Sequence, residues 1–464
     1  MGRDVLAGKR VVILGLARQG VALGSFLAQV GAEVTISDLR DEETLAEELA
    51  VLDGLPIAYV LGEHPPDMLD GVDLLCLSGG VPVDIPVVIE AKRRGIPLSN
   101  DAQIFVERCP ARVIGITGSA GKTTTTSLTG EMCRAAGFRT WVGGNIGNPL
   151  IADLDEIHAD DWVVMELSSF QLELMTTSPH MAAVLNITPN HLDRHETMEA
   201  YIAAKRNVVA YQKIGDHALL GYDDANARSL AQDTVAHLIW FSGRTEVEEG
   251  AFVANDDLIL RVGEGGDRVI CRTEEVQLRG SHNVLNVLAA SALAAAAGIS
   301  LETIREIATT FTGVEHRLEF VREIGGAQWF DDSIATAPER SLAALRSFEE
   351  PIVLLAGGRD KKLPWKKFAD EAVQRVRLLV TFGEAGPMIA QKVGESRVQQ
   401  EMGLLERIVE VETLEQAVEA AARLTEAGDV VLLSPGGTSF DAFADFAERG
   451  DRFRALVHEL AVED

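Results

Sequence analysis

The sequence lacks the features that mark secreted and membrane-embedded proteins. Only four cysteines occur among the 464 residues, with no C-x-x-C pair and no disulfide-framework spacing, so we expect reduced, partly buried thiols. No apolar run reaches the ~18 residues that a membrane-spanning helix needs, and we recognise no signal peptide before the first strand-like run. These absences predict a cytoplasmic protein without a membrane segment.

Positive charge is also scarce. The chain has 42 Lys and Arg residues against 71 Asp and Glu residues, which gives a formal net charge of −29. Such a surface repels nucleic acid and anionic membranes, so we expect neither as a partner. Because the same charge repels phosphorylated substrates at long range, any phosphate site must carry its own cations or backbone donors.

The order of apolar and polar residues indicates an α/β protein with several domains. Apolar residues make up 47% of the chain, and its length exceeds that of one ordinary domain. Short apolar runs alternate with amphipathic stretches, which is typical of βαβ units and parallel sheets. The polar, strand-like stretch from 235 to 277 has no clear period. We place domain boundaries near Asn100 and Gly313.

The strongest local signal is the glycine-rich turn from Gly115 to Thr123, between a predicted strand over 112–116 and a predicted helix over 121–136. Backbone N–H groups of such a turn cradle phosphates, its lysine reaches the β- and γ-phosphates, and its hydroxyl binds Mg²⁺. The early glycine is Gly118 rather than residue 116, a departure from the usual P-loop spacing. The turn predicts nucleoside triphosphate binding, and a plain helix-starting turn is the alternative. The residues predicted to contact ATP here are Gly118, Ser119, Ala120, Gly121, Lys122, Thr123 and Thr124.

A second glycine turn, Gly15 to Gly20, follows the first predicted strand, and Asp38 ends the next one. The pattern approximates a Rossmann fingerprint, in which such an acid holds a ribose. Ala17 occupies the second glycine position, where a side chain keeps a pyrophosphate further from the backbone, and Arg18 and Arg40 add cations nearby. The turn therefore predicts a nucleotide other than NAD, with an NAD site and plain turn structure as alternatives.

Further motifs follow these turns along nearly the whole chain. They are Gly143–Gly147, Glu166–Glu173, Asn190–Arg194, Ala203–Lys205, His282–Asn283, Glu315–Arg317, Asp331–Ser333, Ser434–Pro435 and Ser439–Asp441. Together with the loop at Gly115–Thr123, this ordered set resembles the Mur ligase family, and its glutamate-adding branch in particular. The resemblance implies three α/β domains: a Rossmann-like UDP-substrate domain over 1–100, a central P-loop domain for ATP and Mg²⁺ over 101–313, and a Rossmann-like glutamate domain over 314–464.

The resemblance also implies a reaction. A carboxylate does not accept an amine directly, because oxide is too poor a leaving group. ATP would first phosphorylate the alanine carboxylate of UDP-N-acetylmuramoyl-L-alanine, and the amine of glutamate would then displace phosphate, in peptidoglycan precursor synthesis. D-glutamate is the expected substrate and L-glutamate the alternative. Two Mg²⁺ ions would neutralise the phosphates, and the enzyme is expected to work as a monomer on these small molecules alone.

Residue roles follow from the resemblance, position by position. The implied catalytic residues are Lys122, Glu166, His191, Lys205 and Arg317. The implied metal ligands are Thr123, Glu166, His191 and Lys205, the last as a carbamate formed with CO₂. The implied UDP-substrate residues are Gly15, Leu16, Ala17, Arg18, Asp38, Arg40, Ser78, Asn145 and His191. The remaining ATP residues are Asn283, Asn286, Arg317 and Asp332, and the glutamate residues are Thr336, Lys361, Ser439, Phe440 and Phe446.

Sequence context alone leaves plainer roles open for several of these residues. Glu166 closes an apolar strand, where a solvated strand-end charge is the alternative to an ion ligand. A lysine on an amphipathic helix, such as Lys205, is usually solvated, and a loop histidine is usually structural. Asn283 and Asn286 stand near a predicted helix start and could be caps.

Three positions depart from the family pattern. Ile334 stands where the family has lysine, and Ala337 where it has asparagine. The glutamate end of the site thereby loses a cation and an amide, so that Lys361, backbone donors or an unidentified cation must serve instead, and the handedness of glutamate stays open. Gly79 replaces a proline beside Ser78, which predicts a more mobile loop.

Three rival functions remain at this level. A folylpolyglutamate-type ligase shares the ATP chemistry but would lack the βαβ unit before the P-loop. An NAD-dependent oxidoreductase would leave the Gly-Lys-Thr loop idle. A P-loop switch would hydrolyse ATP without an amino acid.

Overall fold

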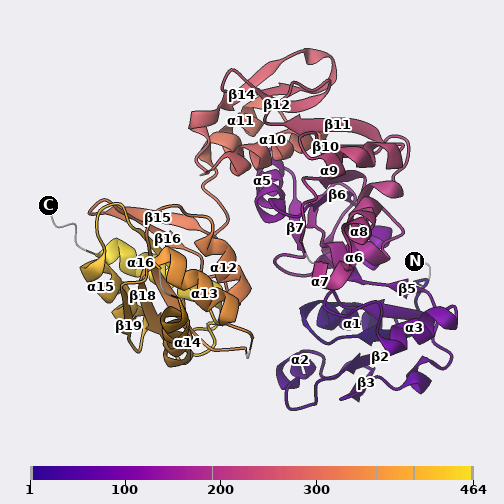
Figure 1. Ribbon diagram of the computed structural model, residues 1–464. Coiled ribbons are helices and arrows are strands. Elements are labelled where there is room, and N and C mark those ends of the chain that lie inside the picture. The colour runs from indigo at the N-terminus through magenta and orange to yellow at the C-terminus, as the bar shows by residue number, and fades with distance from the viewer. Residues whose placement is uncertain (1–3, 191, 279, 362, 401–402, 461–464) are drawn as a thin grey trace. The chain divides into compact units, whose positions relative to one another are not determined.

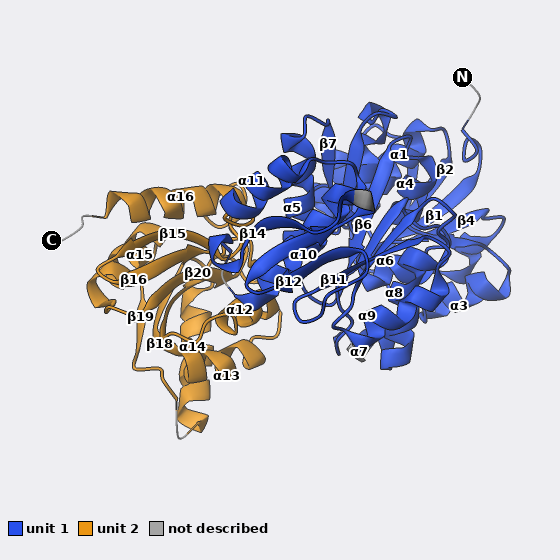
Figure 2. Cartoon of the chain, turned by 90° about the horizontal axis from the view of Figure 1, so that it is seen from above, with its two compact units in different colours: residues 1–311 blue, residues 312–464 orange. Residues whose placement is uncertain are grey.

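A computed structural model describes the chain except for residues 1–3, 191, 279, 362, 401–402 and 461–464. The chain forms two compact units, residues 1–311 and residues 312–464 (Figure 2). Unit 1 contains two sheets and unit 2 contains one. The boundary predicted near Asn100 lies inside unit 1, and the division into three domains at 100 and 313 stays a prediction.

The first sheet is wholly parallel, in the order β3-β2-β1-β4-β5. Its strands are β1 Arg10–Leu14, β2 Glu33–Asp38, β3 Ile57–Leu61, β4 Leu74–Leu77 and β5 Leu98–Ser99. Its helices are α1 Arg18–Gln29, α2 Ala46–Val51, α3 Pro86–Arg93 and α4 Asp101–Arg108 (Figure 1). The strand order reverses at β1, which lies between β2 and β4, and ligands of open α/β sheets bind at the carboxyl ends of strands at such a point.

The second sheet of unit 1 has nine strands in the order β14-β13-β12-β11-β10-β9-β6-β8-β7. Its strands are β6 Arg112–Thr117, β7 Thr140–Gly144, β8 Trp162–Glu166, β9 Met181–Val184, β10 His217–Gly221, β11 His237–Ser242, β12 Gly250–Ala254, β13 Asp257–Arg261 and β14 Arg268–Arg272. The strands from β7 to β12 pair in parallel, and β12, β13 and β14 form an antiparallel meander. The sheet is therefore mixed, and the polar stretch noted in the sequence supplies its antiparallel end.

Helices and two hydrophobic clusters cover the two faces of this second sheet. The helices are α5 Lys122–Ala135, α6 Ser169–Leu174, α7 Leu192–His195, α8 Met198–Ala210, α9 Ala225–Ser229, α10 Ser281–Ala296 and α11 Leu301–Thr310. Side chains of successive residues point to opposite faces of a strand, so Val113 joins one cluster and Ile114 the other. The cluster of Val113 also contains Ile13 of β1 and Phe26 of α1, so the first two sheets share a hydrophobic core.

The sheet of unit 2 has the order β15-β16-β20-β17-β18-β19. Its strands are β15 Glu319–Ile324, β16 Ala327–Asp331, β17 Ile352–Gly357, β18 Val376–Phe382, β19 Arg407–Glu410 and β20 Val430–Gly436. Its helices are α12 Pro338–Leu345, α13 Lys366–Arg375, α14 Gly386–Gln399, α15 Leu414–Leu424 and α16 Phe446–Glu459. All residues of β17 and β20 are buried, as expected for parallel strands covered on both faces. Among the described strands of this sheet, β15 alone pairs antiparallel, and it lies at the edge.

The predicted α/β class is confirmed, with differences at particular elements. The βαβ pattern predicts parallel strands, whereas β15 pairs with β16 antiparallel. β9 ends at Val184, which leaves Asn186 in the following loop. Within the described part of the chain, no helix is long and apolar enough to cross a membrane.

Candidate active site

The P-loop turn has a fixed shape between β6 and α5. Gly121, the residue before α5, has φ 84°, and a Cβ added there would lie 2.3 Å from Asn286 Oδ1. The N–H of Ala120 donates to Asn186 Oδ1 at 2.9 Å. Lys122 folds back over the loop, where its Nζ donates to the carbonyl oxygen of Gly118 at 3.1 Å. The turn therefore presents backbone donors and one ammonium group at the start of a helix, as an anion site requires.

Glu166 lies beside this turn because β8 pairs with β6, with Ile116 opposite Glu166. Its side chain is buried at 2% exposure. The hydroxyl of Thr123 donates to Glu166 Oε2 at 2.8 Å, and Asn145 Nδ2 donates to Oε1 at 2.8 Å. The alternative of a solvated strand-end charge is therefore wrong. A buried carboxylate and a threonine hydroxyl side by side offer the hard oxygen ligands that Mg²⁺ prefers, so these residues fit the ion.

Lys205 reaches the same place from α8. Only 1% of it is exposed, and its Nζ donates to Thr117 Oγ1 at 3.2 Å and to the carbonyl oxygen of Gly118 at 3.0 Å. Burial, and then the charge of Lys122, hold the pKa of Lys205 well below its usual value, although Glu166 opposes this. The solvated lysine favoured by sequence context is therefore wrong.

An aromatic column that the sequence analysis did not predict supports the turn. His195 lies between Phe170 and Tyr201, with ring centroids 5.3 Å and 5.2 Å away. Its Nε2 is 3.0 Å from Ser169 Oγ, and the Tyr201 hydroxyl is 3.1 Å from Ser119 Oγ. Single aromatic residues on three different helices give no sequence signal of this contact. His191, the predicted metal and substrate residue, lies outside the described residues.

Asn283 and Asn286 lie on α10, against the P-loop helix. The helix begins at Ser281 after the cap residue Gly280, so neither asparagine is a cap and that alternative is wrong. Asn286 Nδ2 donates to Asn283 Oδ1 at 2.8 Å, and Asn286 Oδ1 accepts from Thr125 Oγ1 at 3.4 Å. The pair is thus built into the wall beside the phosphate loop.

The first glycine turn is closed by contacts from the next strands. Gly15 has φ 89°, and its carbonyl oxygen accepts from Ser78 Oγ at 2.8 Å. The N–H of Gly79 donates to Gln19 Oε1 at 3.1 Å, a contact that the sequence analysis did not predict. Arg18 Nη2 donates to the carbonyl oxygen of Asn145 at 3.4 Å, which brings two predicted UDP-substrate residues together from different sheets.

Asp38 is committed to the shape of this turn. Its Oδ2 accepts from the N–H of Leu16 at 2.7 Å, and Arg40 donates to both oxygens at 2.9–3.0 Å. Arg40 Nη2 also donates to the carbonyl oxygen of Leu16 at 2.9 Å. Burial alone would raise the pKa of Asp38, but the hydrogen bonds from Arg40 and Leu16 lower it to about 2. Both carboxylate oxygens therefore have protein donors. Asp38 holds the first glycine turn in shape and does not present a free carboxylate.

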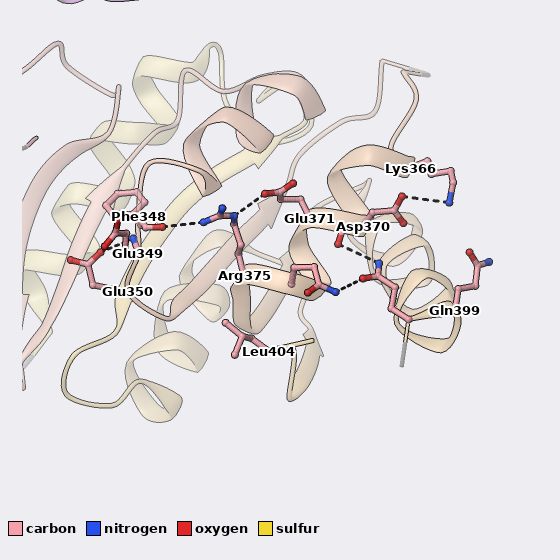
Figure 3. A pocket seen from close by; sticks show the side chains of 11 residues that line it. Phe348, Glu349, Glu350, Lys366, Asp370, Glu371, Arg375, Gln399 and Leu404 are labelled. Atoms are coloured by element: carbon pink, nitrogen blue, oxygen red, sulfur yellow. Dashed lines mark hydrogen bonds and ion pairs between the residues drawn. The ribbon is translucent and has the colours of Figure 1, made fainter. Parts of the chain in front are cut away.

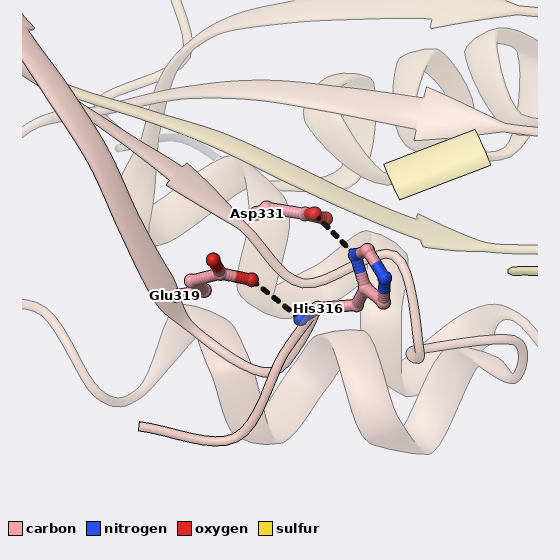
Figure 4. A group of neighbouring side chains, drawn as sticks. All are labelled: His316, Glu319 and Asp331. Atoms are coloured by element: carbon pink, nitrogen blue, oxygen red, sulfur yellow. Dashed lines mark hydrogen bonds and ion pairs between the residues drawn. The ribbon is translucent and has the colours of Figure 1, made fainter. Parts of the chain in front are cut away.

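Unit 2 holds Arg317 and Asp332 next to a buried ion pair. His316 Nδ1 is 2.8 Å from Asp331 Oδ2, and its backbone N–H donates to Glu319 Oε2 at 2.7 Å (Figure 4). Asp332 accepts from Ser434 Oγ at 2.7 Å. Burial raises the pKa of Asp332 to about 7, against the opposing effects of Ser434 and Arg317. The cluster holds His316 and Asp331, the residues that directly precede Arg317 and Asp332.

The five predicted glutamate residues follow three neighbouring strands or begin the next helix. Thr336 follows β16, Lys361 follows β17, and Ser439 and Phe440 follow β20; Phe446 begins α16. The segments after β17 and β20 are tied together, because the N–H groups of Arg359 and Thr438 each donate to the other's carbonyl oxygen, at 2.8 and 2.9 Å. Ser439 is buried, whereas Phe440 is 58% exposed.

A groove elsewhere in unit 2 contains none of these residues. It has a volume of about 810 Å³ and is lined by side chains such as Phe348, Glu371, Arg375 and Leu404 (Figure 3). Phe348 precedes β17, so the groove reaches the amino ends of the strands, opposite the carboxyl ends where the predicted glutamate residues lie.

Three family models match successive parts of the chain. They are the Mur ligase MurD-like N-terminal domain over residues 9–100, the Mur ligase middle domain over 116–294, and the Mur ligase glutamate ligase domain over 316–437. A UDP-N-acetylmuramoylalanine--D-glutamate ligase from Acetivibrio thermocellus is 41% identical over 455 residues, covering 98% of this chain and 97% of the relative. A relative of the same name from Clostridium novyi is 38% identical over 458 residues, covering 99% and 98%.

Solved structures show the same fold at lower identity. The UDP-N-acetylmuramate-alanine ligase MurC from Thermotoga maritima is similar with a TM-score of 0.52 and 19% identity, over 97% of this chain and 99% of that one. A murein peptide ligase from Psychrobacter arcticus is similar with a TM-score of 0.52 and 15% identity, over 98% and 100%. With relatives of 38–41% identity along nearly its whole length, the chain belongs to the Mur ligase family of ATP-dependent ligases.

Proposed function

We propose that this protein joins D-glutamate to UDP-N-acetylmuramoyl-L-alanine with the cleavage of ATP to ADP and phosphate. The observation that carries the proposal is the meeting of Thr123, Glu166 and Lys205 around one phosphate loop. Neither an NAD-dependent oxidoreductase nor a simple nucleotide switch would explain why Lys205 is buried beside the phosphate loop. The printed names of the relatives supply the substrates.

The residues of unit 1 divide the work on ATP. The backbone donors of the P-loop and the ammonium of Lys122 bind the β- and γ-phosphates, and the wall formed by Asn283 and Asn286 takes the nucleoside side. Thr123 and Glu166, together with His191, would hold two Mg²⁺ ions, which when bound neutralise charge on the phosphates. Arg317 and Asp332 of unit 2 are proposed to contact the phosphates and the ribose.

Lys205 is proposed to be carbamylated. A lysine must be neutral to attack CO₂, and burial lowers its pKa in the required direction. The nitrogen lone pair attacks the carbon of CO₂, one N–H proton leaves, and the product is an anionic carbamate. The group adds carboxylate-like oxygens beside Glu166, which suits a hard cation.

The chemistry then runs through an acyl phosphate. An oxygen of the alanine carboxylate attacks the γ-phosphorus of ATP, and ADP leaves. The neutral amine of glutamate attacks the acyl carbon, the amine loses a proton, and phosphate departs with the oxygen that came from the carboxylate. Fixed donors aimed at developing negative charge are the largest expected contribution to such a rate.

On the UDP-substrate side, the turn formed by Gly15, Leu16 and Ala17, with Arg18, Ser78 and Asn145, is proposed to hold the nucleotide. Asp38 and Arg40 act by fixing the turn. Ala17, the cap residue of α1, makes no side-chain cap hydrogen bond, and the N–H groups at the start of α1, with the side chain of Arg18, are proposed to bind phosphate.

Glutamate is assigned to unit 2 through Thr336, Lys361, Ser439, Phe440 and Phe446. D-glutamate is preferred because these residues stand in place and because the relatives of 38–41% identity carry the D-glutamate name. Because ATP and UDP-sugars are cytoplasmic metabolites, we place the enzyme in the cytoplasm, and we propose that it acts as a monomer.

One assay tests the substrate assignment. Phosphate release is measured with UDP-N-acetylmuramoyl-L-alanine, ATP, Mg²⁺ and single amino acids of both hands. We expect release with D-glutamate, little release without an amino acid, and a product that chiral analysis resolves as the D-glutamyl compound. Exclusive incorporation of L-glutamate would overturn the stereochemical assignment and leave the ligase function intact, whereas amino-acid-independent hydrolysis would overturn the ligase function itself.

A further inference from the structure

Arg449 is a fully buried arginine on α16 that no sequence motif singled out. Its Nε donates to Ser333 Oγ at 3.0 Å, its Nη2 to the carbonyl oxygen of Ser333 at 2.9 Å, and its Nη1 to the carbonyl oxygen of Gly437 at 3.2 Å. All three acceptors are neutral. Among the described residues, no carboxylate oxygen lies within ion-pair distance of the guanidinium. A buried charge without a counterion is costly, so its retention needs a cause.

The guanidinium lies where the chain segments after three strands meet. Ser333 follows β16 and Gly437 follows β20, and these segments lead to Thr336 and Ser439. Gly358, after β17, has φ 91°, and a Cβ added there would lie 2.9 Å from Arg449 Nη1 and 2.1 Å from the carbonyl oxygen of Thr438. Arg449 therefore ties together the segments after β16 and β20 by hydrogen bonds and lies close to the segment after β17.

Charged groups of both signs lie around Arg449, although none of the described carboxylates forms an ion pair with it. Asp441 and Asp331 are the acidic groups that act on it through space; Asp331 is hydrogen-bonded to His316, and Asp441 accepts from the backbone N–H of Glu384 at 3.2 Å. Burial lowers the pKa of Arg449 to about 10, which leaves it protonated at neutral pH. Burial lowers the pKa of Lys361, and the positive charges of Arg340 and Arg449 lower it further.

We propose that Arg449 is a positioning and specificity-determining residue for glutamate: it fixes the floor of the glutamate pocket and supplies a permanent buried positive charge that favours a substrate with two carboxylates. Because Arg449 is fully buried, it acts through the field of its charge and through the segments that it holds, and not by touching the substrate. A charge in a medium of low dielectric acts over several ångströms. This inference rests on the proposed function, since it names a residue that serves glutamate.

The test compares Arg449→Met with a variant that returns a cation to the same segment. Ile334 directly follows Ser333 and is only partly buried, so the double variant Ile334→Lys/Arg449→Met places an ammonium group near the lost guanidinium. We expect Arg449→Met to raise the KM for glutamate by about tenfold or more, the equivalent of one strong charge interaction, with the KM for UDP-N-acetylmuramoyl-L-alanine changed less than about twofold. In the double variant, the KM for glutamate should be at least about threefold lower than in Arg449→Met alone.

Two further variants separate charge from structure. Arg452→Met on the same helix removes an arginine whose ion pair with Glu415 is solvent-exposed, and its KM for glutamate should stay within about twofold of wild type. Arg449→Lys keeps the positive charge but loses the planar guanidinium with its several donors. Its KM for glutamate should stay within about threefold of wild type. If Arg449→Met does not fold, this variant decides: a glutamate KM near wild type supports the proposal, and a loss of about tenfold or more overturns it.

Other outcomes overturn the proposal without touching the proposed function. A folded Arg449→Met with an unchanged glutamate KM would do so, as would an equal rise in the KM values of all substrates or no recovery on adding Ile334→Lys. If wild-type protein shows no glutamate-dependent turnover, the proposed function fails first.

Discussion

Asp38→Asn is predicted to loosen the first sheet and to weaken the UDP-substrate site, because Asp38 holds the turn between β1 and α1. The pKa of Asp38 is about 2 against its usual 3.8. Such a difference between the folded and unfolded chain corresponds to about 2 kcal/mol of stability at neutral pH. Because the folded-state pKa is depressed, this stability is present above a pH of about 4 and is lost as pH falls toward about 2.

Hydrogen exchange measures this effect where it occurs. Since a chain of several domains does not unfold in one step, the opening free energy of β1 and β2 is a better quantity than a global one. A loss of about 2 kcal/mol would make their backbone amides exchange about 30-fold faster at pH 7. The KM for UDP-N-acetylmuramoyl-L-alanine should rise while the KM for ATP stays unchanged.

Asp73→Asn is the matched control for this substitution. Asp73 also accepts from an arginine backbone N–H and a lysine in the same sheet, but it is exposed, so we expect a much smaller change in exchange. Unchanged exchange of β1 and β2 in Asp38→Asn, or equal effects of the two substitutions, would refute the role given to Asp38.

The remaining predictions concern the phosphate loop, the buried lysine and the ion pair of unit 2. Lys122→Ala should lose about 2.7–4 kcal/mol of transition-state stabilisation, a fall in kcat of about 10²–10³, with unchanged thermal melting; activity within about tenfold of wild type would contradict the phosphate role. Lys205→Ala should be nearly inactive and partly restored by acetate, and wild-type protein incubated with ¹³CO₂ should show a carbamate carbon signal that the variant lacks; normal activity of the variant would end the carbamate proposal. His316→Asn removes the pair with Asp331, a contribution to stability that is fully present below about pH 6.5 and is lost as pH rises through the raised pKa of His316, so the stability difference from wild type should shrink from pH 6 to pH 9; a difference that grows with pH would contradict this.

The buried parallel strands were the part of the fold most open to sequence reasoning. Runs such as those of β17 and β20 are continuous and apolar because helices cover both faces of the sheet. Edge strands gave weaker signals: β15 is half-exposed and polar, so its pairing with β16 depends on tertiary contacts rather than on a local pattern. The meander of β12 to β14 was seen only as a strand-like stretch.

The segments of the candidate site could be predicted from the sequence, but the contacts between their side chains could not. The P-loop motif placed Lys122 and Thr123 at a helix start, since glycine spacing is a local property. The burial of Lys205 and its contact with Gly118 join residues far apart in the chain, and no periodicity of α8 indicates them. The role of Arg449 could not be predicted from the sequence either. Its hydrogen-bond acceptors are backbone carbonyl groups and a serine hydroxyl, which form no sequence motif.

Activation of the alanine carboxylate as an acyl phosphate leaves an isotopic trace in the phosphate that is released. UDP-N-acetylmuramoyl-L-alanine labelled with ¹⁸O in its terminal carboxylate is converted with ATP, Mg²⁺ and D-glutamate, and the inorganic phosphate is analysed by mass. We expect one ¹⁸O atom in each phosphate released, carried over from the carboxylate, with an equal amount of D-glutamyl product. Unlabelled phosphate, released whether or not D-glutamate is present, would contradict it.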